Sequence, residues 1–201
     1  KTFIVTGGAS GIGAAISLFA EHGFRGTTTR QIAAAVGVTE PVLYEHFATK
    51  SDLYRAIIDA KSLQGIEYLR DALSSYMERE DDRGFFRKLG QVVVEFYDKD
   101  PDYVRLLMFS GLEGHDLADQ YYTRQTKIYL DFVMGYIQRR MKAGAFRKQN
   151  PEVVARCFGG LIGSYAQARI LFPNCVMDID PKKAVDAMVS IFLDGLLNDQ
   201  D

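Results

Sequence analysis

The chain has 201 residues, of which 47% are hydrophobic and 25% are charged, and its formal net charge is -2. This balance excludes a disordered polyelectrolyte and predicts a globular protein with a sizeable core. Two cysteines are too few for a disulfide framework or a zinc site, and no apolar run reaches the roughly 18 residues that a membrane span needs. We therefore expect a soluble cytoplasmic protein, without a cofactor or a metal, that could bind nucleic acid only through a local surface.

The chain opens with a glycine-rich stretch, KTFIVTGGASGIG, over residues 1–13. It resembles the cofactor motif of short-chain dehydrogenases, in which glycines let the backbone approach a pyrophosphate. That motif needs a parallel sheet, and the family places a catalytic Tyr four residues before a Lys, whereas Tyr136 and Tyr165 are followed at that spacing by Arg. An NAD(P)-dependent oxidoreductase is thus an alternative that rests on these residues alone, and we expect an atypical N-terminal segment instead.

From Ala14 onward, apolar residues recur at the three- and four-residue spacing of helices. A first helix is expected to end at Gly23. The capping-box spacing of Thr28 and Gln31 opens a second, TRQIAAAV, which Gly37 closes, and a third, EPVLYEHF, follows Thr39. These helices offer apolar side chains for a small shared core: Ile16, Phe19, Ala20, Ile32, Ala33, Val36, Val38, Leu43 and Phe47.

The remaining helices follow from similar signals. Thr49 and Asp52 begin a long helix that runs to about Glu78, and the polar run at 81–84 interrupts the pattern. Further helices are expected over about 85–99, 101–111, 116–143, 150–172 and 181–198, three of them with a proline in the first turn. The fold class is therefore all-α, with about nine helices and no strand pattern.

Residues 14–53 resemble the DNA-binding domain of TetR-family transcription regulators. The resemblance rests on AAISLFAEHGF followed by TTTRQIAAAVGVTEPVLYEHFATKSDL, in order and without gaps. It implies a helix-turn-helix domain over 14–50, whose third helix enters the major groove of double-stranded operator DNA, and a ligand-binding and dimerisation domain over 51–201. The expected function is that of a repressor that a small-molecule inducer releases from its operator.

The same resemblance assigns the DNA contacts. The side chains expected at backbone phosphates are Thr28, Thr29, Thr39, Tyr44, His46 and Lys50. Those expected at base edges are Glu40, Pro41, Val42 and Glu45. The positive charge of Lys50 opposes the dipole at the start of its helix, which a bound phosphate would explain.

The charge balance of this region supports a second alternative. Residues 14–61 contain five basic and five acidic side chains, so the region has no net attraction for DNA. A helical ligand-binding protein that does not bind DNA is therefore kept as an alternative.

The helices after Gly84 are rich in aromatic residues and methionine, which predicts an adaptable cavity for a small apolar or aromatic inducer. Candidates for its wall are Met108, Phe109, Tyr129 and Phe132, with ordinary core packing as the alternative for each. No nucleophile–base pair or His/Cys cluster stands out in this half, so we do not expect an enzyme.

Two features of the last helices predict a homodimer. Small residues interrupt an apolar helix at Gly159, Gly160, Gly163 and Ser164, where a second helix could approach closely. The last helix, which carries Met188 and Phe192, is apolar over more than half of its circumference and has to bury two faces. A two-fold interface of four helices, two from each subunit, accounts for the small residues and for the second apolar face. The alternative is that the last helix is buried within one subunit.

Overall fold

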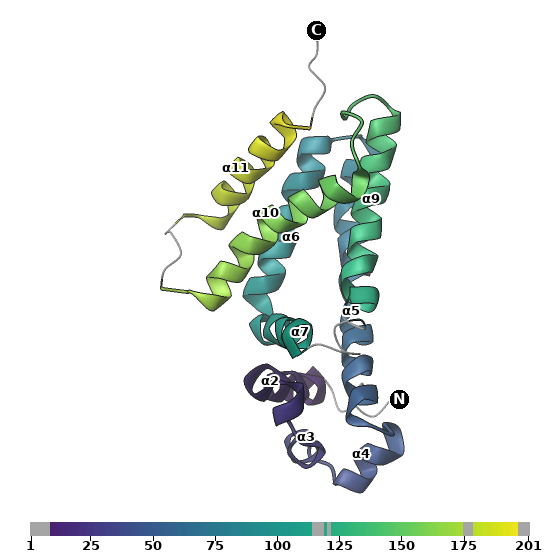
Figure 1. Cartoon of the computed structure of the whole chain (residues 1–201), viewed down its shortest axis with the longest axis vertical. Coiled ribbons are helices and arrows are strands. Elements are labelled where there is room, and N and C mark those ends of the chain that lie inside the picture. Colours follow the sequence, from purple (N-terminus) through teal and green to yellow (C-terminus); the bar gives the residue numbers. More distant parts are fainter. Residues whose placement is uncertain (1–8, 114–118, 120–121, 175–178, 197–201) are drawn as a thin grey trace. The chain divides into compact units, whose positions relative to one another are not determined.

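The computed structural model describes residues 9–113, 119, 122–174 and 179–196. This part of the chain contains nine α-helices, one π-helical turn and no β-strand, so the all-α prediction is confirmed. No helix in it is both long enough and apolar enough to cross a membrane. The elements, shown in Figure 1, are α2 (Ala9–Gly26), α3 (Thr29–Val36), α4 (Glu40–His46), α5 (Lys50–Glu78), α6 (Asp82–Lys99), α7 (Pro101–Glu113), η1 (Tyr122–Thr126), α9 (Lys127–Lys142), α10 (Pro151–Leu171) and α11 (Pro181–Asp194).

The chain folds into two compact units, and both are discontinuous in sequence. Unit 1 consists of residues 1–64 and 100–126, and unit 2 consists of residues 65–99 and 127–201. The first half of α5 and all of α7 therefore belong to the same unit as the helix-turn-helix. This packing division does not follow the functional division at residue 50 that the sequence suggests.

Helix α2 begins five residues before the start expected at Ala14, because packing outweighs the low helix propensity of its glycines. Gly11 and Gly13 lie inside the helix, and the next turns bury Ala15, Ile16 and Phe19 almost completely. Residues 9–13 are thus helical, and the sheet that a dinucleotide motif requires does not occur among the described residues. Residues 1–8 of that motif lie outside the described part.

Hydrogen bonds and backbone angles confirm three of the helix boundaries predicted in unit 1. Thr28 and Gln31 form a reciprocal capping box, with the Gln31 N–H donating to Thr28 Oγ1 at 3.2 Å and the Thr28 N–H donating to Gln31 Oε1 at 2.8 Å. Gly37 ends α3 in the left-handed region with φ 76°. Thr49 Oγ1 accepts from the Asp52 N–H at 3.1 Å and so caps α5.

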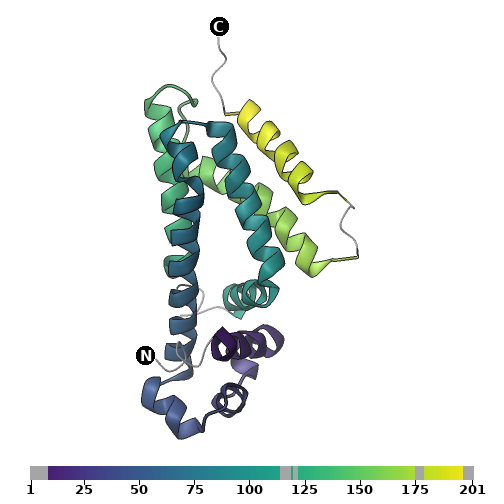
Figure 2. The ribbon, with the colours of Figure 1, turned by 180° about the vertical axis from the view of Figure 1, so that it is seen from behind.

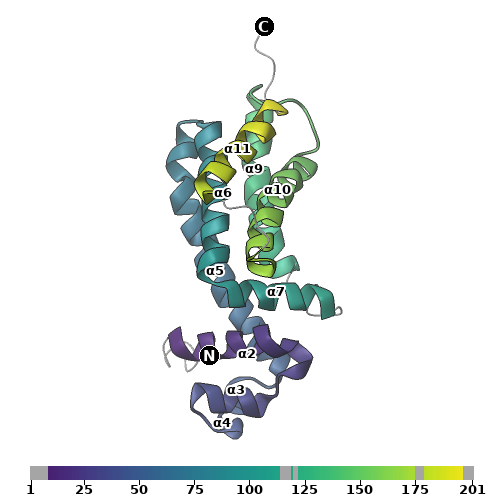
Figure 3. The ribbon, with the colours of Figure 1, turned by 90° about the vertical axis from the view of Figure 1, so that its left-hand side faces the viewer.

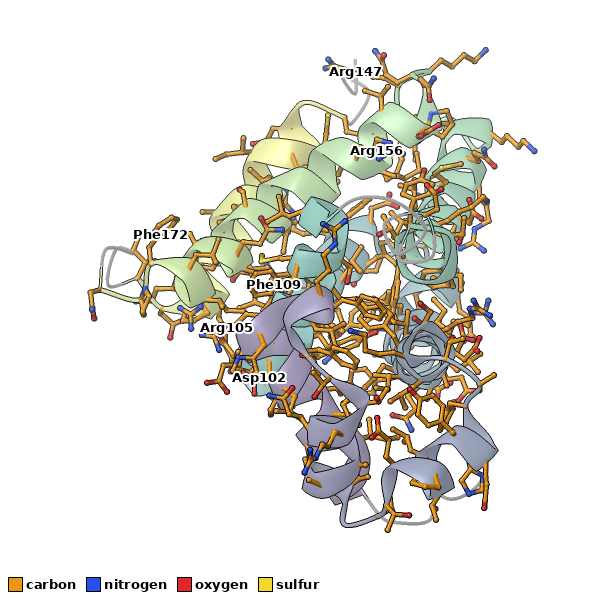
Figure 4. All side chains as sticks on the ribbon, turned by 60° about the horizontal axis from the view of Figure 1, so that its bottom comes forward. Asp102, Arg105, Phe109, Arg147, Arg156 and Phe172 are labelled. Carbon is orange, nitrogen blue, oxygen red and sulfur yellow. The ribbon has the colours of Figure 1, made fainter. Side chains whose placement is uncertain are left out.

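Helix α7 packs along α2 and completes unit 1 (Figure 3). Ser17 Oγ donates to Asp102 Oδ2 at 2.9 Å, and the two residues are 85 positions apart in the sequence. Figure 4 shows Asp102, Arg105 and Phe109 in succession along α7, next to α2. A second link joins α5 to the start of α7, where Lys61 Nζ lies 2.7 Å from Asp100 Oδ2. The helix-turn-helix is therefore held by a helix that lies far away in the sequence.

Unit 2 is built around α6, against which α10 and α11 both pack (Figure 2). The fully buried ring of Phe86 lies 4.9 Å from the rings of Phe158 on α10 and Phe192 on α11. Gly90 allows this close approach, because a Cβ at that position would lie 2.8 Å from Val185 Cγ1. Phe85 and Phe86 of α6 therefore lie in the core of unit 2 rather than on its surface.

A buried arginine ties α9 to the start of α6. The Arg140 guanidinium donates from Nε to Asp82 Oδ1 at 2.8 Å and from Nη2 to Asp82 Oδ2 at 3.0 Å. The Tyr136 hydroxyl donates to the same Asp82 Oδ1 at 2.6 Å, and burial raises the pKa of Tyr136 well above its usual range. Burying the Arg140 guanidinium or the Asp82 carboxylate alone would cost considerable free energy, and the bidentate hydrogen bonds between them offset that cost.

Besides the start of α2, two expected helix boundaries were wrong. Helix α6 begins at Asp82 rather than near Phe85, because Asp82–Gly84 form its first turn and the Gly84 N–H bonds Asp81 Oδ1 at 2.8 Å. The expected start of the helix over 116–143 lies outside the described residues; residue 119 is helical, and the described part continues with the π-helical turn η1 and α9. Helix α11 ends at Asp194 rather than near Asn198.

Candidate nucleic-acid interface

Helix α4 presents a short exposed surface on a buried base. Leu43 is 4% exposed and the helix ends at Phe47, which is 8% exposed, so these two side chains anchor α4 in the core of unit 1. The side chains that remain in contact with solvent include most of the predicted DNA contacts: Pro41, Tyr44, Glu45 and His46 are exposed, and Glu40 and Val42 are half-buried. The geometry is thus that of a helix whose outward face is free to enter a groove.

The predicted phosphate-binding threonines differ in their local roles. The Thr28 hydroxyl is occupied within the chain, because it caps α3 and contacts Gln31 Oε1 at 2.8 Å. Thr39 precedes α4 as its exposed N-cap residue, but its side chain makes no capping hydrogen bond. Thr29 begins α3 and its Oγ1 donates to Glu40 Oε1, so α3 and α4 are linked at their first residues.

Lys50 is held by the carbonyl groups at the end of α2. Its Nζ donates to the backbone oxygen of Phe24 at 2.5 Å and to that of Thr27 at 2.7 Å, and it lies 4.3 Å from the centroid of the Phe24 ring. These oxygens stabilise the ammonium group at the start of α5 without any bound phosphate. Contacts within the chain thus account for the ammonium group at this position, Phe24 is a partner that the sequence pattern does not reveal, and a contact of Lys50 with a phosphate stays a prediction.

Internal pairing reduces the positive charge that unit 1 can offer to DNA. Lys61 is paired with Asp100, and Arg55 lies 3.4 Å from Asp52. Arg30 on α3 is exposed. These ion pairs therefore weaken the long-range attraction of unit 1 for phosphates.

The four predicted pocket residues belong to different units. Tyr129 and Phe132 are partly buried against the core of unit 2, whereas Met108 is half-buried and Phe109 is 38% exposed in unit 1. Burial raises the pKa of Tyr129 to about 12, and its hydroxyl lies 2.0 Å from the position that a Cβ on Gly65 would occupy. A lone glycine inside the α5 pattern is the signal that could have identified this contact.

Two further observations bear on ligand binding in unit 2. The Tyr165 hydroxyl on α10 is buried without a well-aligned hydrogen bond among the described residues, and the guanidinium carbon of Arg169 lies 5.8 Å from the centroid of its ring. A groove of about 180 Å³ lies at the start of α6, and its lining is polar, unlike that of the predicted pocket: Tyr76, Asp81, Arg83, Gly84, Arg87, Lys88 and Gln91.

The predicted dimer residues fall into two groups. Gly159, Gly160 and Ser164 are exposed, and a Cβ at Gly159, Gly160 or Gly163 would meet no atom of the described residues within 4 Å. They share α10 with an exposed stripe at helical spacing, formed by Val153, Cys157, Gly160, Ser164, Gln167 and Leu171. The exposed Phe172, labelled in Figure 4, follows the stripe. Met188 and Phe192, in contrast, pack against the core of unit 2, which accounts for their apolar character within one chain.

Two family models match the chain. Residues 12–57 match the bacterial regulatory proteins of the tetR family, and residues 96–195 match the C-terminal domain of AefR-like transcriptional repressors. The chain belongs to the TetR family. It is thus a DNA-binding transcriptional regulator, which confirms the function expected from residues 14–53, and the oxidoreductase alternative has no support.

This TetR-family regulator is similar to several characterised proteins. It is 25% identical over 183 residues to the HTH-type transcriptional activator FasR of Mycolicibacterium smegmatis, a match that covers 91% of this chain and 80% of FasR. It is 29% identical over 140 residues to the HTH-type transcriptional repressor KstR2 of Rhodococcus jostii, covering 66% of this chain and 64% of KstR2.

Solved structures share the fold. The fatty acid degradation regulator FadR of Bacillus halodurans superposes with a TM-score of 0.77 at 19% identity, covering 92% of this chain and 97% of FadR. AibR, solved with isovaleryl coenzyme A and operator DNA, superposes with a TM-score of 0.61 at 21% identity, covering 90% of this chain and 95% of AibR.

Proposed function

We propose that this TetR-family regulator is a homodimeric repressor that occupies an operator through α4 and leaves it when a small molecule binds to the C-terminal part of the chain. The observation that carries the proposal is the exposed face of α4, with Tyr44 and Glu45 directed to solvent on a base formed by the buried Leu43. A helix anchored in this way can enter a major groove about 12 Å wide without any rearrangement of its core.

Within this proposal, the exposed face divides into two kinds of contact. The hydroxyl groups of Tyr44 and Thr29 donate hydrogen bonds to backbone phosphates, and these contacts set the register of α4 on the duplex. Pro41, Val42 and Glu45 contact base edges, where an apolar side chain recognises a thymine methyl group and a carboxylate accepts from cytosine N4.

The stripe on α10 is our candidate for the two-fold interface. Its small residues, Gly160 and Ser164, would let a second α10 approach closely, and Leu171 and Phe172 are 50% and 58% exposed. On the neighbouring α11, Ile191 is 71% exposed. A two-fold partner would bury these side chains, and a two-fold dimer would bind two half-sites separated by one turn of the double helix, about 34–36 Å.

We further propose that the inducer carries an apolar chain. Named relatives of this fold are a fatty acid degradation regulator and a protein bound to an acyl-coenzyme A thioester. In the present chain, Tyr129 and Tyr165 are partly buried in unit 2, and the buried Tyr165 hydroxyl, which lies beside Arg169, could bond a carbonyl oxygen of such a ligand. Helix α7, which packs on α2, directly follows α6 of unit 2 in the sequence and would carry the signal.

The test begins with selection of a preferred duplex from a random library, followed by fluorescence anisotropy titrations and by the addition of short- and long-chain acyl-coenzyme A thioesters. We expect one palindromic sequence to be enriched and at least one thioester to release it. Tyr44→Phe should weaken binding to all sequences by about tenfold, the effect of one lost hydrogen bond to a charged group.

Tyr68→Phe, at a tyrosine of α5 that is 52% exposed, is the matched control and should leave DNA affinity unchanged. Enrichment of no sequence would refute operator binding. Because FasR is named an activator, a reporter strain decides the sign of regulation: deletion of the regulator raises transcription if it is a repressor.

A further inference from the structure

A chain of three side chains connects the first residues of α3 and α4. Thr29 Oγ1 donates to Glu40 Oε1, and the Tyr44 hydroxyl lies 3.2 Å from the same Thr29 Oγ1. Thr29 and Glu40 are half-buried, whereas Tyr44 is 47% exposed. The sequence analysis had placed Glu40 at a base edge, but its carboxylate is bonded to the neighbouring helix.

The hydrogen-bond capacities of these groups fix the direction of the chain. A threonine hydroxyl has a single proton, and an ionised carboxylate only accepts. Because the Thr29 proton goes to Glu40, the contact between Tyr44 and Thr29 needs the proton of Tyr44. Both hydroxyl protons are therefore directed into the protein, and the series ends on the negative charge of Glu40.

This arrangement conflicts with phosphate binding by the same two hydroxyl groups. A phosphate is also an anion that only accepts, so it needs the protons that the chain of hydrogen bonds directs to Glu40. We infer that Glu40 is an internal competitor of the DNA backbone: its carboxylate occupies the Thr29 and Tyr44 hydroxyls in the free protein and has to release them before a phosphate can bind. The inference rests on the proposed function, in which these hydroxyls contact phosphates.

Glu40 is on this view a positioning residue that lowers affinity for every DNA sequence alike. A hydrogen bond to a carboxylate is stronger than one to a neutral amide oxygen, and the difference is enough to reduce binding about fourfold when a phosphate has to take the proton from the carboxylate. A dimer carries the competitor twice, so the reduction applies once for each half-site. Low affinity for unrelated DNA keeps the protein available for its operator, which occurs among very many competing sites.

The experiment compares Glu40→Gln with the wild-type protein. Glutamine keeps an acceptor for the Thr29 hydroxyl and removes the charge. The probes are a duplex selected with the wild-type protein and a random-sequence duplex of the same length, each titrated at two salt concentrations. We expect affinity for both duplexes to rise by the same factor, about fourfold for each half-site, with the larger gain at low salt.

Glu21→Gln is the matched control, because it removes an equal charge from an exposed position of unit 1 that is assigned no DNA contact. If Glu21→Gln raises affinity for the random duplex as much as Glu40→Gln does, the effect is one of net charge and the inference is wrong. If Glu40→Gln changes the preferred base sequence, Glu40 reads bases and the inference is also wrong.

A double-mutant cycle with Thr29→Val tests the competition itself. Without the Thr29 hydroxyl there is no proton to release, so Glu40→Gln should raise affinity less in the Thr29→Val background than in the wild type. Equal gains in both backgrounds would refute competition for the hydroxyl. A lower melting temperature together with weaker binding in Glu40→Gln would make the carboxylate a purely structural link and would refute it as well.

The outcomes separate this inference from the function on which it rests. Wild-type protein that binds neither duplex refutes the proposed function. Wild-type protein that binds its selected duplex, with no gain in Glu40→Gln, refutes only the role of Glu40.

Discussion

Lys50→Met is expected to destabilise unit 1 and to weaken DNA binding indirectly. The substitution keeps the length of the side chain and removes the ammonium group that bonds the carbonyl oxygens of Phe24 and Thr27. The end of α2 then loses its link to the start of α5. Because α2 packs against both α3 and α7, its displacement would affect the support of α4.

The size of the effect follows from the contacts. Each hydrogen bond to a charged donor contributes about 1.5–3 kcal/mol, and a partly exposed cation over an aromatic ring adds about 0.5–1 kcal/mol. Because Lys50 is half-buried and the carbonyl groups can bind water once it is gone, we expect a net loss of roughly 2–4 kcal/mol. For a chain of this size, the melting temperature should fall by roughly 4–16 °C.

The assay combines thermal melts followed by circular dichroism with DNA titrations at several salt concentrations. Arg30→Met is the control, because it removes a positive charge from an exposed position in the same unit and should leave the melting temperature unchanged. The reasoning is refuted if Lys50→Met melts like the wild type and instead lowers the slope of log affinity against log salt by about one per half-site. In that case the ammonium group leaves the carbonyls and binds a phosphate.

Three further predictions concern unit 2. Gly90→Ala should lower stability by about 1–3 kcal/mol in denaturant titrations, because the added Cβ would lie 2.8 Å from Val185 Cγ1; an unchanged midpoint would show that the helices can separate freely. Folding raises the pKa of Tyr129 from 10.0 to about 12, so its contribution to stability is complete below pH 10 and is lost as the pH rises towards 12. Tyr129→Phe should therefore lose less stability than the wild type between pH 10 and pH 12, and equal losses would contradict the assignment. Gly160→Leu should shift the protein to monomer in sedimentation, whereas Gly135→Leu, at an exposed glycine of α9 that also has open space around it, should not; a dimer that survives Gly160→Leu would place the interface elsewhere.

Features that depend on a few neighbouring residues were predictable from the sequence. The capping box at Thr28 and the left-handed Gly37 are local, since the groups that bond lie within five residues of each other. The prolines at 101, 151 and 181 likewise begin helices as predicted. The face of α4 was also predictable, because periodicity alone places Leu43 inside and Glu45 outside.

Features that depend on distant residues were missed. The early start of α2 could not be read from its glycines, because the burial of Ile16 and Phe19 that favours it depends on tertiary packing. The partners of Lys50 lie 23 and 26 residues before it, and the partner of Glu40 lies 11 residues before it. Periodicity in the sequence shows whether a side chain faces inward or outward, but it does not identify the group that the side chain contacts.

The discontinuity of unit 1 has a consequence for how the protein is made and for how it can be divided. A nascent chain that has released only α2, α3 and α4 lacks the surface on which α2 rests, because α7 begins at Pro101. A fragment that ends before α7 avoids the entropic cost of closing that long loop, but it also lacks the packing of α7 on α2 that outweighs this cost in the whole chain. A chimera that transfers the DNA-reading helices to another ligand-binding domain should therefore include α7, together with Asp102 that bonds Ser17.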